Sequence, residues 1–246
     1  MAEFIIKIAG HAAKISSSFG STRDYCRAYL TEEEPEYYIT VTKGDLEFEQ
    51  RFLDQEALEE GLRRRVFSDP FLERAAIQRK LSEQLLEQGI LLVHGSTVSV
   101  DAQGYLFTAK CGTGKSTHTR LWRQTFGDLA VMVNDDKPFV AVTGQEILVS
   151  GSPWSGKHGL DTNITVPLKG ICILTRGKEN RIRRISGEEA RDMIFHQASP
   201  PLDEKKRPQF EWLVENLLDR VAFWEMECNQ EPEAALTAYR AMSQRK

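Results

Sequence analysis

Residues 109–117 read AKCGTGKST, and the interpretation of the whole chain starts from this stretch. An apolar segment, 105–109, leads into this stretch and has the pattern of a strand. The segment 116–126, which begins at the end of the stretch, has the pattern of a helix. A glycine-rich turn in this context is typical of a phosphate-binding loop, because backbone N–H groups and the helix N-terminus attract phosphate oxygens. The residues predicted to bind nucleotide are Cys111, Gly112, Thr113, Gly114, Lys115, Ser116 and Thr117.

Two side chains of this loop have predicted roles. Lys115 would reach the terminal phosphates as a point charge, and the Ser116 hydroxyl would ligate Mg²⁺. Ala109 replaces the first glycine of the usual GxxxxGK[ST] pattern, which a small residue can do where its backbone φ is negative. The alternative is a glycine-rich turn with a lysine in the first turn of the helix. We expect ATP, or another nucleotide donor, and Mg²⁺ as cofactors.

An acidic pair follows the next apolar segment. Residues 129–133 have the pattern of a buried strand and lead into Asn134, Asp135 and Asp136, about twenty residues after Lys115. Phosphate-loop enzymes often hold Mg²⁺ with an acid at such a strand end, and a second acid can polarise the nucleophile. We therefore predict Asp135 as a metal ligand with Ser116 and Asp136 as the catalytic base. The two acids could exchange these roles, and an acidic turn that only caps the strand is the alternative.

Together with His94-Gly95 before the loop, these residues resemble the HPr kinase and phosphoenolpyruvate carboxykinase superfamily over roughly residues 90–200. The resemblance implies an α/β fold with a mixed-sheet P-loop kinase core of that type. It also implies a histidine near the phosphates and the metal, which makes His94 catalytic together with Lys115 and Asp136. A histidine buried at a strand end is the alternative for His94.

The chain departs from that superfamily in ways that narrow the expected activity. Lys137 stands where HPr kinase has an arginine after its acid pair, and the second HPr-kinase signature has no convincing match. The chain is also far shorter than a carboxykinase. The resemblance therefore favours a small kinase-like member of the superfamily. HPr itself cannot be assumed to be its substrate.

The chain is predicted to have three regions. Residues 1–89 form an N-terminal α+β region for the acceptor or a partner, residues 90–200 the kinase core, and residues 201–246 a C-terminal helical region packed on the core. Apolar periodicity predicts strands at 3–8, 36–42, 90–93, 98–100, 105–109, 129–133, 139–142, 147–149, 171–174 and 222–226. Helices are expected at 53–66, 71–88, 116–126, 187–197, 208–219 and 232–243, with Gly89 as a cap and a capping box from Ser186 to Glu189.

Residues 151–163 form a long loop, which is often a sign of function. Lys157 could neutralise the transferring phosphoryl group and Trp154 could pack on a substrate or base, while Arg176, near a strand end, could contact phosphate. The predicted substrate residues are Trp154, Lys157, His158, Asn163 and Arg176. The alternatives are a connector with one anchoring tryptophan and, for Arg176, a solvated cluster of charge.

Composition excludes several classes of protein. With 41% hydrophobic and 28% charged residues the chain can form a core and is not a disordered tail. A net charge of −4 argues against a nucleic-acid partner. The apolar runs are far shorter than the ~20 residues that span a bilayer, so we expect no membrane partner. No signal-peptide pattern or CxxC pair is present, and we expect a cytoplasmic protein.

The predicted function is an ATP- and Mg²⁺-dependent kinase that transfers a phosphoryl group to a hydroxyl acceptor. The acceptor would be a serine of a peptide or protein, or a small molecule. One alternative is a nucleotide-binding regulatory module without turnover, and another is a kinase that modifies a precursor peptide. The sequence leaves open the acceptor, a donor other than ATP, and whether the chain forms an oligomer.

Overall fold

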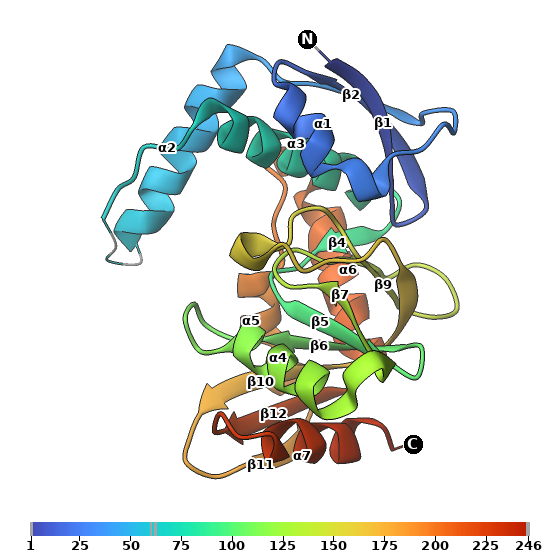
Figure 1. Ribbon diagram of the computed structural model, residues 1–246, viewed down its shortest axis with the longest axis vertical. Coiled ribbons are helices and arrows are strands. Elements are labelled where there is room, and N and C mark those ends of the chain that lie inside the picture. Colours follow the sequence, from blue (N-terminus) through green and yellow to red (C-terminus); the bar gives the residue numbers. More distant parts are fainter. Residues whose placement is uncertain (1, 60, 62, 245–246) are drawn as a thin grey trace. The chain divides into compact units, whose positions relative to one another are not determined.

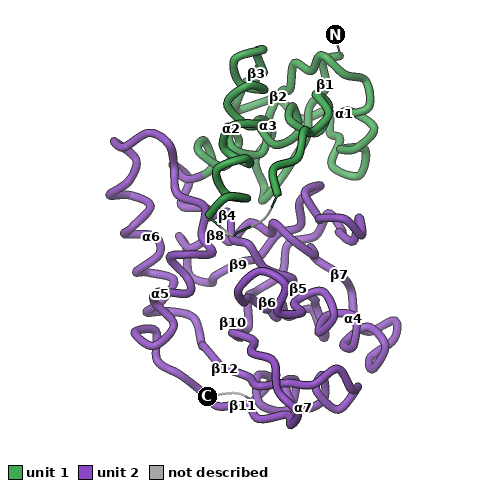
Figure 2. The backbone as a smooth tube through the Cα atoms, turned by 90° about the vertical axis from the view of Figure 1, so that its left-hand side faces the viewer, with its two compact units in different colours: residues 1–85 green, residues 86–246 purple. Residues whose placement is uncertain are grey.

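The computed structural model describes residues 2–59, 61 and 63–244. The chain divides into two compact units, Met1–Leu85 and Leu86–Lys246, which Figure 2 colours separately. Figure 1 labels the elements of both units. Each unit has its own sheet.

The described residues of the first unit form a three-stranded sheet and three α-helices. Strands β1 and β2 form a hairpin whose two turn residues, Ala9 and Gly10, both have positive φ, and β3 pairs with β2 in parallel. Positive φ at both turn positions matches the right-handed twist of the flanking strands. The bounds of its elements are β1 Ala2–Ile8, β2 His11–Ser17, α1 Gly20–Tyr25, a 3-10 turn Arg27–Tyr29, β3 Tyr37–Thr40, α2 Lys43–Glu59 and α3 Asp69–Leu86.

The predicted helix at 53–66 is wrong at both ends. Helix α2 begins ten residues earlier, at Lys43, and residues 63–66 are not helical, while residues 60 and 62 lie outside the described residues. The early start follows from a reciprocal cap: the Thr42 hydroxyl accepts from the Asp45 N–H, and the Asp45 carboxylate accepts from the Thr42 N–H. The helix predicted at 71–88 is confirmed as α3, and Gly89 closes its end with an N–H bond to the Leu86 carbonyl.

The second unit is α/β with a mixed sheet, as predicted. Strand β10 is parallel to β6 and β12, whereas β5 is antiparallel to β6 and β7. The strand order is β4-β8-β9-β10-β6-β5-β7, with β12 beside β10 and β11 beside β12. The strands are β4 Ile90–Leu92, β5 Ser96–Val100, β6 Gln103–Thr108, β7 Ala130–Asn134, β8 Phe139–Ala141, β9 Leu148–Ser150, β10 Thr165–Arg176, β11 Arg181–Ile185 and β12 Phe223–Cys228.

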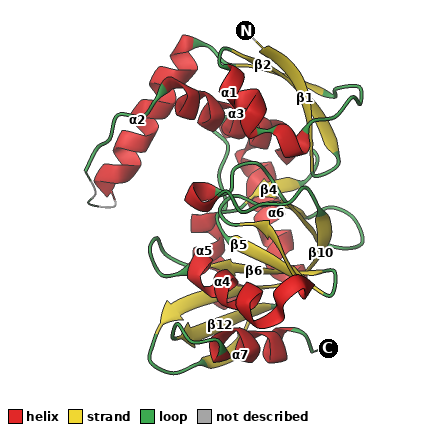
Figure 3. Cartoon of the chain, viewed as in Figure 1, coloured by secondary structure: helices red, strands yellow, loops and turns green. Residues whose placement is uncertain are grey.

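Helices cover both faces of this sheet (Figure 3). Successive residues of a strand point to opposite faces, so Leu106 and Phe107 of β6 enter two separate apolar clusters. The Leu106 cluster includes residues of α5 and α6, and the Phe107 cluster includes residues of α4 and α7. The helical elements are α4 Lys115–Phe126, α5 Gly187–Gln197, α6 Arg207–Arg220, α7 Glu233–Met242, and 3-10 turns Gly127–Leu129, Gly156–His158 and Glu204–Lys206.

Several predicted elements of this unit are confirmed. Helix α4 begins within one residue of its predicted start, and α5 carries the predicted capping box between Ser186 and Glu189. Helices α6 and α7 and the strand between them, β12, also lie where the sequence predicts them. In the ranges that the structure describes, no helix is long and apolar enough to cross a membrane.

Candidate active site at the glycine-rich loop

The loop between β6 and α4 depends on two glycines. Gly112 has φ +71° and Gly114 has φ +122°, and only glycine adopts such values without strain. No atom lies within 4 Å of the position that a Cβ on Gly112 would take. Ala109 is not among the residues with positive φ, so the alanine fits the place of the first glycine. The backbone therefore has the strand-loop-helix form that a phosphate site requires.

Lys115 extends back over this loop. Its side chain is largely buried, and its Nζ donates to the Ala109 carbonyl at 3.2 Å. Burial lowers the pKa of Lys115, and the charge of Lys137 adds to this, while Cys111, Asp136 and Asp135 act in the opposite direction. The ammonium group thus lies within electrostatic reach of both acids, which places the loop and the acid pair in one site.

Arg176, at the end of β10, holds the loop from the neighbouring strand. Its Nε donates to the Thr113 carbonyl at 3.1 Å, and its Nη2 donates to the Gly112 carbonyl. These bonds occupy carbonyl groups of the loop. Among its N–H groups, that of Thr113 donates to the Lys110 carbonyl at 3.2 Å. The structure therefore gives Arg176 a contact with the loop backbone, and its contact with phosphate stays a prediction.

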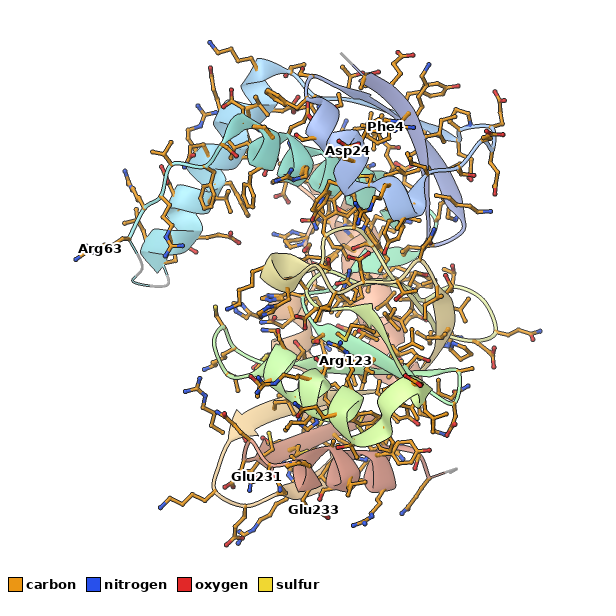
Figure 4. All side chains as sticks on the ribbon, viewed as in Figure 1. Phe4, Asp24, Arg63, Arg123, Glu231 and Glu233 are labelled. Atoms are coloured by element: carbon orange, nitrogen blue, oxygen red, sulfur yellow. The ribbon has the colours of Figure 1, made fainter. Side chains whose placement is uncertain are left out.

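Strand order brings His94 and the acid pair to the loop. Strand β5 lies between β6 and β7 and is antiparallel to both. Its first residues therefore meet the last residues of the other two strands, where β6 enters the loop and β7 enters the acid pair. Helix α4, on which Figure 4 labels Arg123, starts at this same end of the sheet.

Asp135 lies beside hydroxyl groups from two other elements. Its Oδ1 accepts from Ser96 at 2.6 Å, and the Ser116 hydroxyl lies close enough to its carboxylate to lower the pKa of Asp135. Burial raises the pKa of Asp135, and the hydrogen bonds from Ser96 and Ser116 work against that rise. Ser116 and Asp135, the two predicted metal ligands, are therefore adjacent.

Asp136 pairs with His94. His94 Nε2 lies 3.2 Å from Asp136 Oδ1, and both side chains are about one-third exposed. Burial favours a higher pKa for Asp136, but the His94 hydrogen bond and the charges of Lys137 and Lys115 outweigh it and lower that pKa. Burial also lowers the pKa of His94, against the pull of Asp136. At neutral pH the arrangement is a neutral imidazole that donates Nε2–H to an ionised carboxylate.

Asn134 fixes the acid pair, a role that the sequence did not suggest. It is fully buried, and its Oδ1 accepts from the backbone N–H groups of Asp136 at 2.8 Å and Lys137 at 2.6 Å. Its Nδ2 donates to the Ser152 carbonyl at 2.8 Å and lies 3.3 Å from the Trp154 carbonyl. The one available signal was its residue type, since asparagine often bonds to the backbone two residues ahead.

The long loop at 151–163 lies against Asp136. A Cβ added to Gly156 would come within 3.2 Å of Asp136 Cβ, and the Trp154 carbonyl accepts from the Lys137 N–H. The Trp154 ring is 6% exposed and packs edge-to-face on Phe139. This placement fits the alternative in which Trp154 anchors the loop. Three of the predicted substrate residues are exposed on this loop: Lys157, His158 and Asn163.

The donor atoms of this site suit magnesium. Among the residues that the structure describes, no group of three or more His, Cys, Asp or Glu side chains could hold a metal ion. Mg²⁺ does not need such a group, because it is usually bound by one or two protein ligands together with waters and substrate phosphates. The Ser116 hydroxyl and the Asp135 carboxylate are hard oxygen donors of the kind it requires.

Similarity to known proteins is found among solved structures. No protein-family model matches the chain, and no curated protein sequence matches it. Among solved structures, the chain is similar to the HPr(Ser) kinase/phosphatase from Coxiella burnetii. The identity is 12% and the TM-score 0.37, and the match covers 62% of this chain and 97% of that chain. At this level the likeness assigns no role to any residue.

Proposed function

We propose that this protein is an ATP- and Mg²⁺-dependent phosphotransferase that acts on a hydroxyl acceptor. The observation that supports it is the meeting of three parts at one end of the sheet. These parts are the loop with Lys115, the adjacent oxygen donors of Ser116 and Asp135, and the ionised Asp136 held by His94. Phosphoryl transfer needs little more than this, because positioning and charge stabilisation account for most of its catalysis.

The nucleotide phosphates would lie over the loop. Backbone N–H groups of residues 111–117 other than Thr113, whose N–H donates to the Lys110 carbonyl, would surround the terminal phosphates at the N-terminus of α4. Lys115 would turn from the Ala109 carbonyl toward these phosphates. Ser116 and Asp135 would hold the metal ion beside these phosphates. When bound, Mg²⁺ neutralises charge that develops on the phosphate oxygens and the leaving group.

The acceptor hydroxyl would approach from the side of Asp136. As its oxygen forms a bond to the terminal phosphorus, the bond from that phosphorus to the nucleoside diphosphate breaks, and the hydroxyl proton moves to the Asp136 carboxylate. The lowered pKa of Asp136 keeps the base ionised at neutral pH, and the His94 Nε2–H holds its orientation. Lys157, His158 and Asn163, exposed on the adjoining loop, would contact the acceptor.

Substitution of the base tests this proposal. Asp136→Asn is expected to keep ATP affinity within about twofold and to lower phosphoryl transfer by about 10²–10⁴, the usual contribution of a general base. Transfer is measured with radiolabelled ATP and Mg²⁺, to water as the simplest acceptor and to a panel of seryl peptides. Asp128→Asn, an exposed acid in the turn after α4, is the matched control.

Two outcomes would contradict parts of the proposal. Full turnover by Asp136→Asn would remove Asp136 as the base. Tight ATP binding by the unmodified protein without transfer to any acceptor would favour the regulatory module over the enzyme.

A further inference from the structure

A chain of three side chains joins the acid pair to the helix that follows the loop. Ser96 Oγ lies 2.6 Å from Asp135 Oδ1 and 2.7 Å from Thr119 Oγ1. All three side chains are buried, with Ser96 at 0%, Thr119 at 1% and Asp135 at 6% exposure. A buried polar chain of this kind is costly unless every member is bonded, so its geometry is closely defined.

Topology explains why Ser96 can join these parts. Strand β5 pairs with β6 on one side and β7 on the other, and Ser96 is its first residue. Ser96 lies opposite Phe107, near the end of β6, and the next residue, Thr97, lies opposite Asn134, at the end of β7. Ser96 is therefore next to both functional strand ends, on the side that faces α4.

Counting protons gives the direction of the bonds. An ionised carboxylate only accepts, so Ser96 donates its single hydroxyl proton to Asp135. Ser96 can then only accept from Thr119, which donates its own proton to Ser96. The Lys115 and Ser116 carbonyls lie farther from Thr119 Oγ1, at 3.4 and 3.3 Å. The order Thr119 to Ser96 to Asp135 satisfies both hydroxyls and leaves the carboxylate negative.

We propose that Ser96 is a positioning residue for the metal site, with Thr119 as its support. Ser96 fixes one oxygen of the Asp135 carboxylate, so that this group is held beside the Ser116 hydroxyl before a cation arrives. Thr119 lies one helical turn after Lys115 on α4, so the loop helix and the acid are kept in register. This inference rests on the proposed function, since it concerns the ligands of the same metal.

The chain provides a matched control one residue away. Thr97 follows Ser96 on β5 and is equally buried, yet its hydroxyl has no hydrogen-bond partner among the described residues. Side chains of adjacent strand residues point to opposite faces, so Thr97 points away from Thr119. Thr97→Val removes a buried hydroxyl of the same strand without touching the proposed chain.

The experiment measures Mn²⁺ binding, because Mn²⁺ substitutes for Mg²⁺ and free Mn²⁺ is read directly by electron paramagnetic resonance. Full-length protein is titrated with Mn²⁺ in the presence of ATP, and ATP affinity is measured separately in EDTA. Ser96→Ala is expected to weaken Mn²⁺ binding by about 10–100-fold, the usual effect of losing a residue that orients a metal ligand. ATP affinity in EDTA is expected to change by less than about twofold.

The other variants separate positioning from general damage. Thr119→Ser keeps the hydroxyl and should bind Mn²⁺ like the unmodified protein, whereas Thr119→Val keeps the shape and should weaken binding by about tenfold. Thr97→Val should have no effect. If Ser96→Ala does not fold, the comparison of Thr119→Val with Thr119→Ser decides.

Unchanged Mn²⁺ affinity in Ser96→Ala, or in Thr119→Val where that pair decides, overturns the inference. An equal loss of ATP affinity in EDTA also overturns it, because the substitution would then have distorted the loop. The proposed function itself fails in a different way, when the unmodified protein binds neither ATP nor Mn²⁺ with ATP.

Discussion

Asn134 is the residue that holds the candidate active site in shape. The Oδ1 of its buried amide accepts from the backbone N–H groups of Asp136 and Lys137. Its Nδ2 donates to the Ser152 carbonyl in the loop at 151–155. Without the amide, the Asp136 N–H and the Ser152 carbonyl would lose this partner, whereas the Lys137 N–H would keep the Trp154 carbonyl. Asp136 thus depends on Asn134 for its position, although Asn134 does not touch the acceptor in the proposed reaction.

Asn134→Ala is predicted to lower the free energy of unfolding by about 3 kcal/mol, since the fully buried amide forms hydrogen bonds to backbone groups on both its oxygen and its nitrogen. Urea denaturation followed by tryptophan fluorescence measures this. The control is Asn216→Ala, whose amide bonds to the Trp212 carbonyl of its own helix, and which should cost less than about 0.5 kcal/mol. Equal, small losses in both variants would contradict the role given to Asn134.

Arg176 acts on the other side of the site, through the loop backbone. Arg176→Ala is predicted to weaken ATP binding by about tenfold, because the Gly112 and Thr113 carbonyls lose the group that orients them. Arg176→Lys should restore only part of the affinity, since an ammonium group cannot form the same forked contact. Calorimetric titration with ATP measures both, and Arg181→Ala, an exposed arginine of β11, is the control. Unchanged affinity in Arg176→Ala would contradict this account.

At the residue scale, the sequence predicted the functional groups that lie together in short contiguous runs. The loop and the acid pair are short runs whose spacing carries their chemistry, and the structure places them together. Ser96 and Thr119 bond to side chains that lie on other elements, so no local pattern marks them. Asn134 bonds partly within its own turn, which only its residue type could have suggested. Arg176 was found by its position at a strand end, but its partners are backbone carbonyls more than sixty residues away.

Among the elements, α2 shows how a cap can override apolar periodicity. The Asp45 carboxylate accepts from the Thr42 N–H at 2.8 Å, from the Thr42 hydroxyl at 2.7 Å and from Lys80 Nζ at 2.8 Å. Burial works to raise the pKa of Asp45, but the bonds from Lys80 and Thr42 outweigh it and lower the pKa from 3.8 to about 2. The ionised form is therefore favoured by folding.

This shift predicts an acid-sensitive contribution to the stability of the first unit. A folded-state pKa below the unfolded value stabilises the fold above the unfolded pKa, and the contribution disappears as pH falls through the folded pKa. Asp45→Asn is predicted to cost about 2 kcal/mol at pH 7 and to have lost most of that cost by pH 2. Urea denaturation followed by circular dichroism at pH 7, 4 and 2 measures it. A cost that stays constant over this range would contradict the assignment.

Other elements mark the limit of prediction from periodicity. Helix α4 was found within one residue because a glycine-rich loop starts it and Gly127 ends it. Strand β2 and helix α1 were not predicted, because the polar residues that face Glu73 interrupt their apolar pattern: Ser17 and Thr22 both donate to its carboxylate. The position of β5 between β6 and β7 is a matter of long-range pairing, which no local pattern shows.

Over the whole molecule, the chain has two units, and all groups of the candidate active site lie in the second. All four tryptophans, at positions 122, 154, 212 and 224, also belong to that unit. In the first unit the carboxylate of Glu73, which is 1% exposed, accepts from Ser17 Oγ and the Ser18 N–H, both at 2.6 Å, and from Thr22. The two units can therefore be followed by different signals.

Glu73→Ala is predicted to destabilise the first unit by about 3 kcal/mol, because the buried Ser17 and Thr22 hydroxyls and the Ser18 N–H lose this acceptor. Circular dichroism should show part of the helical signal lost at lower urea, while the tryptophan fluorescence transition and the ATP affinity stay unchanged. A parallel shift of the fluorescence transition would show that the two units unfold as one.

The central claim is that the loop at 109–117 binds the phosphates of a nucleotide. Calorimetric titration of the full chain with ATP and Mg²⁺ tests it most directly, with Lys115→Ala compared with Lys110→Ala, the exposed lysine of the same loop. The account predicts saturable binding that Lys115→Ala weakens by at least about tenfold, since a charge-assisted phosphate contact is lost, while Lys110→Ala leaves it within about twofold. Equal affinity in all three proteins, or none in the unmodified one, would contradict it.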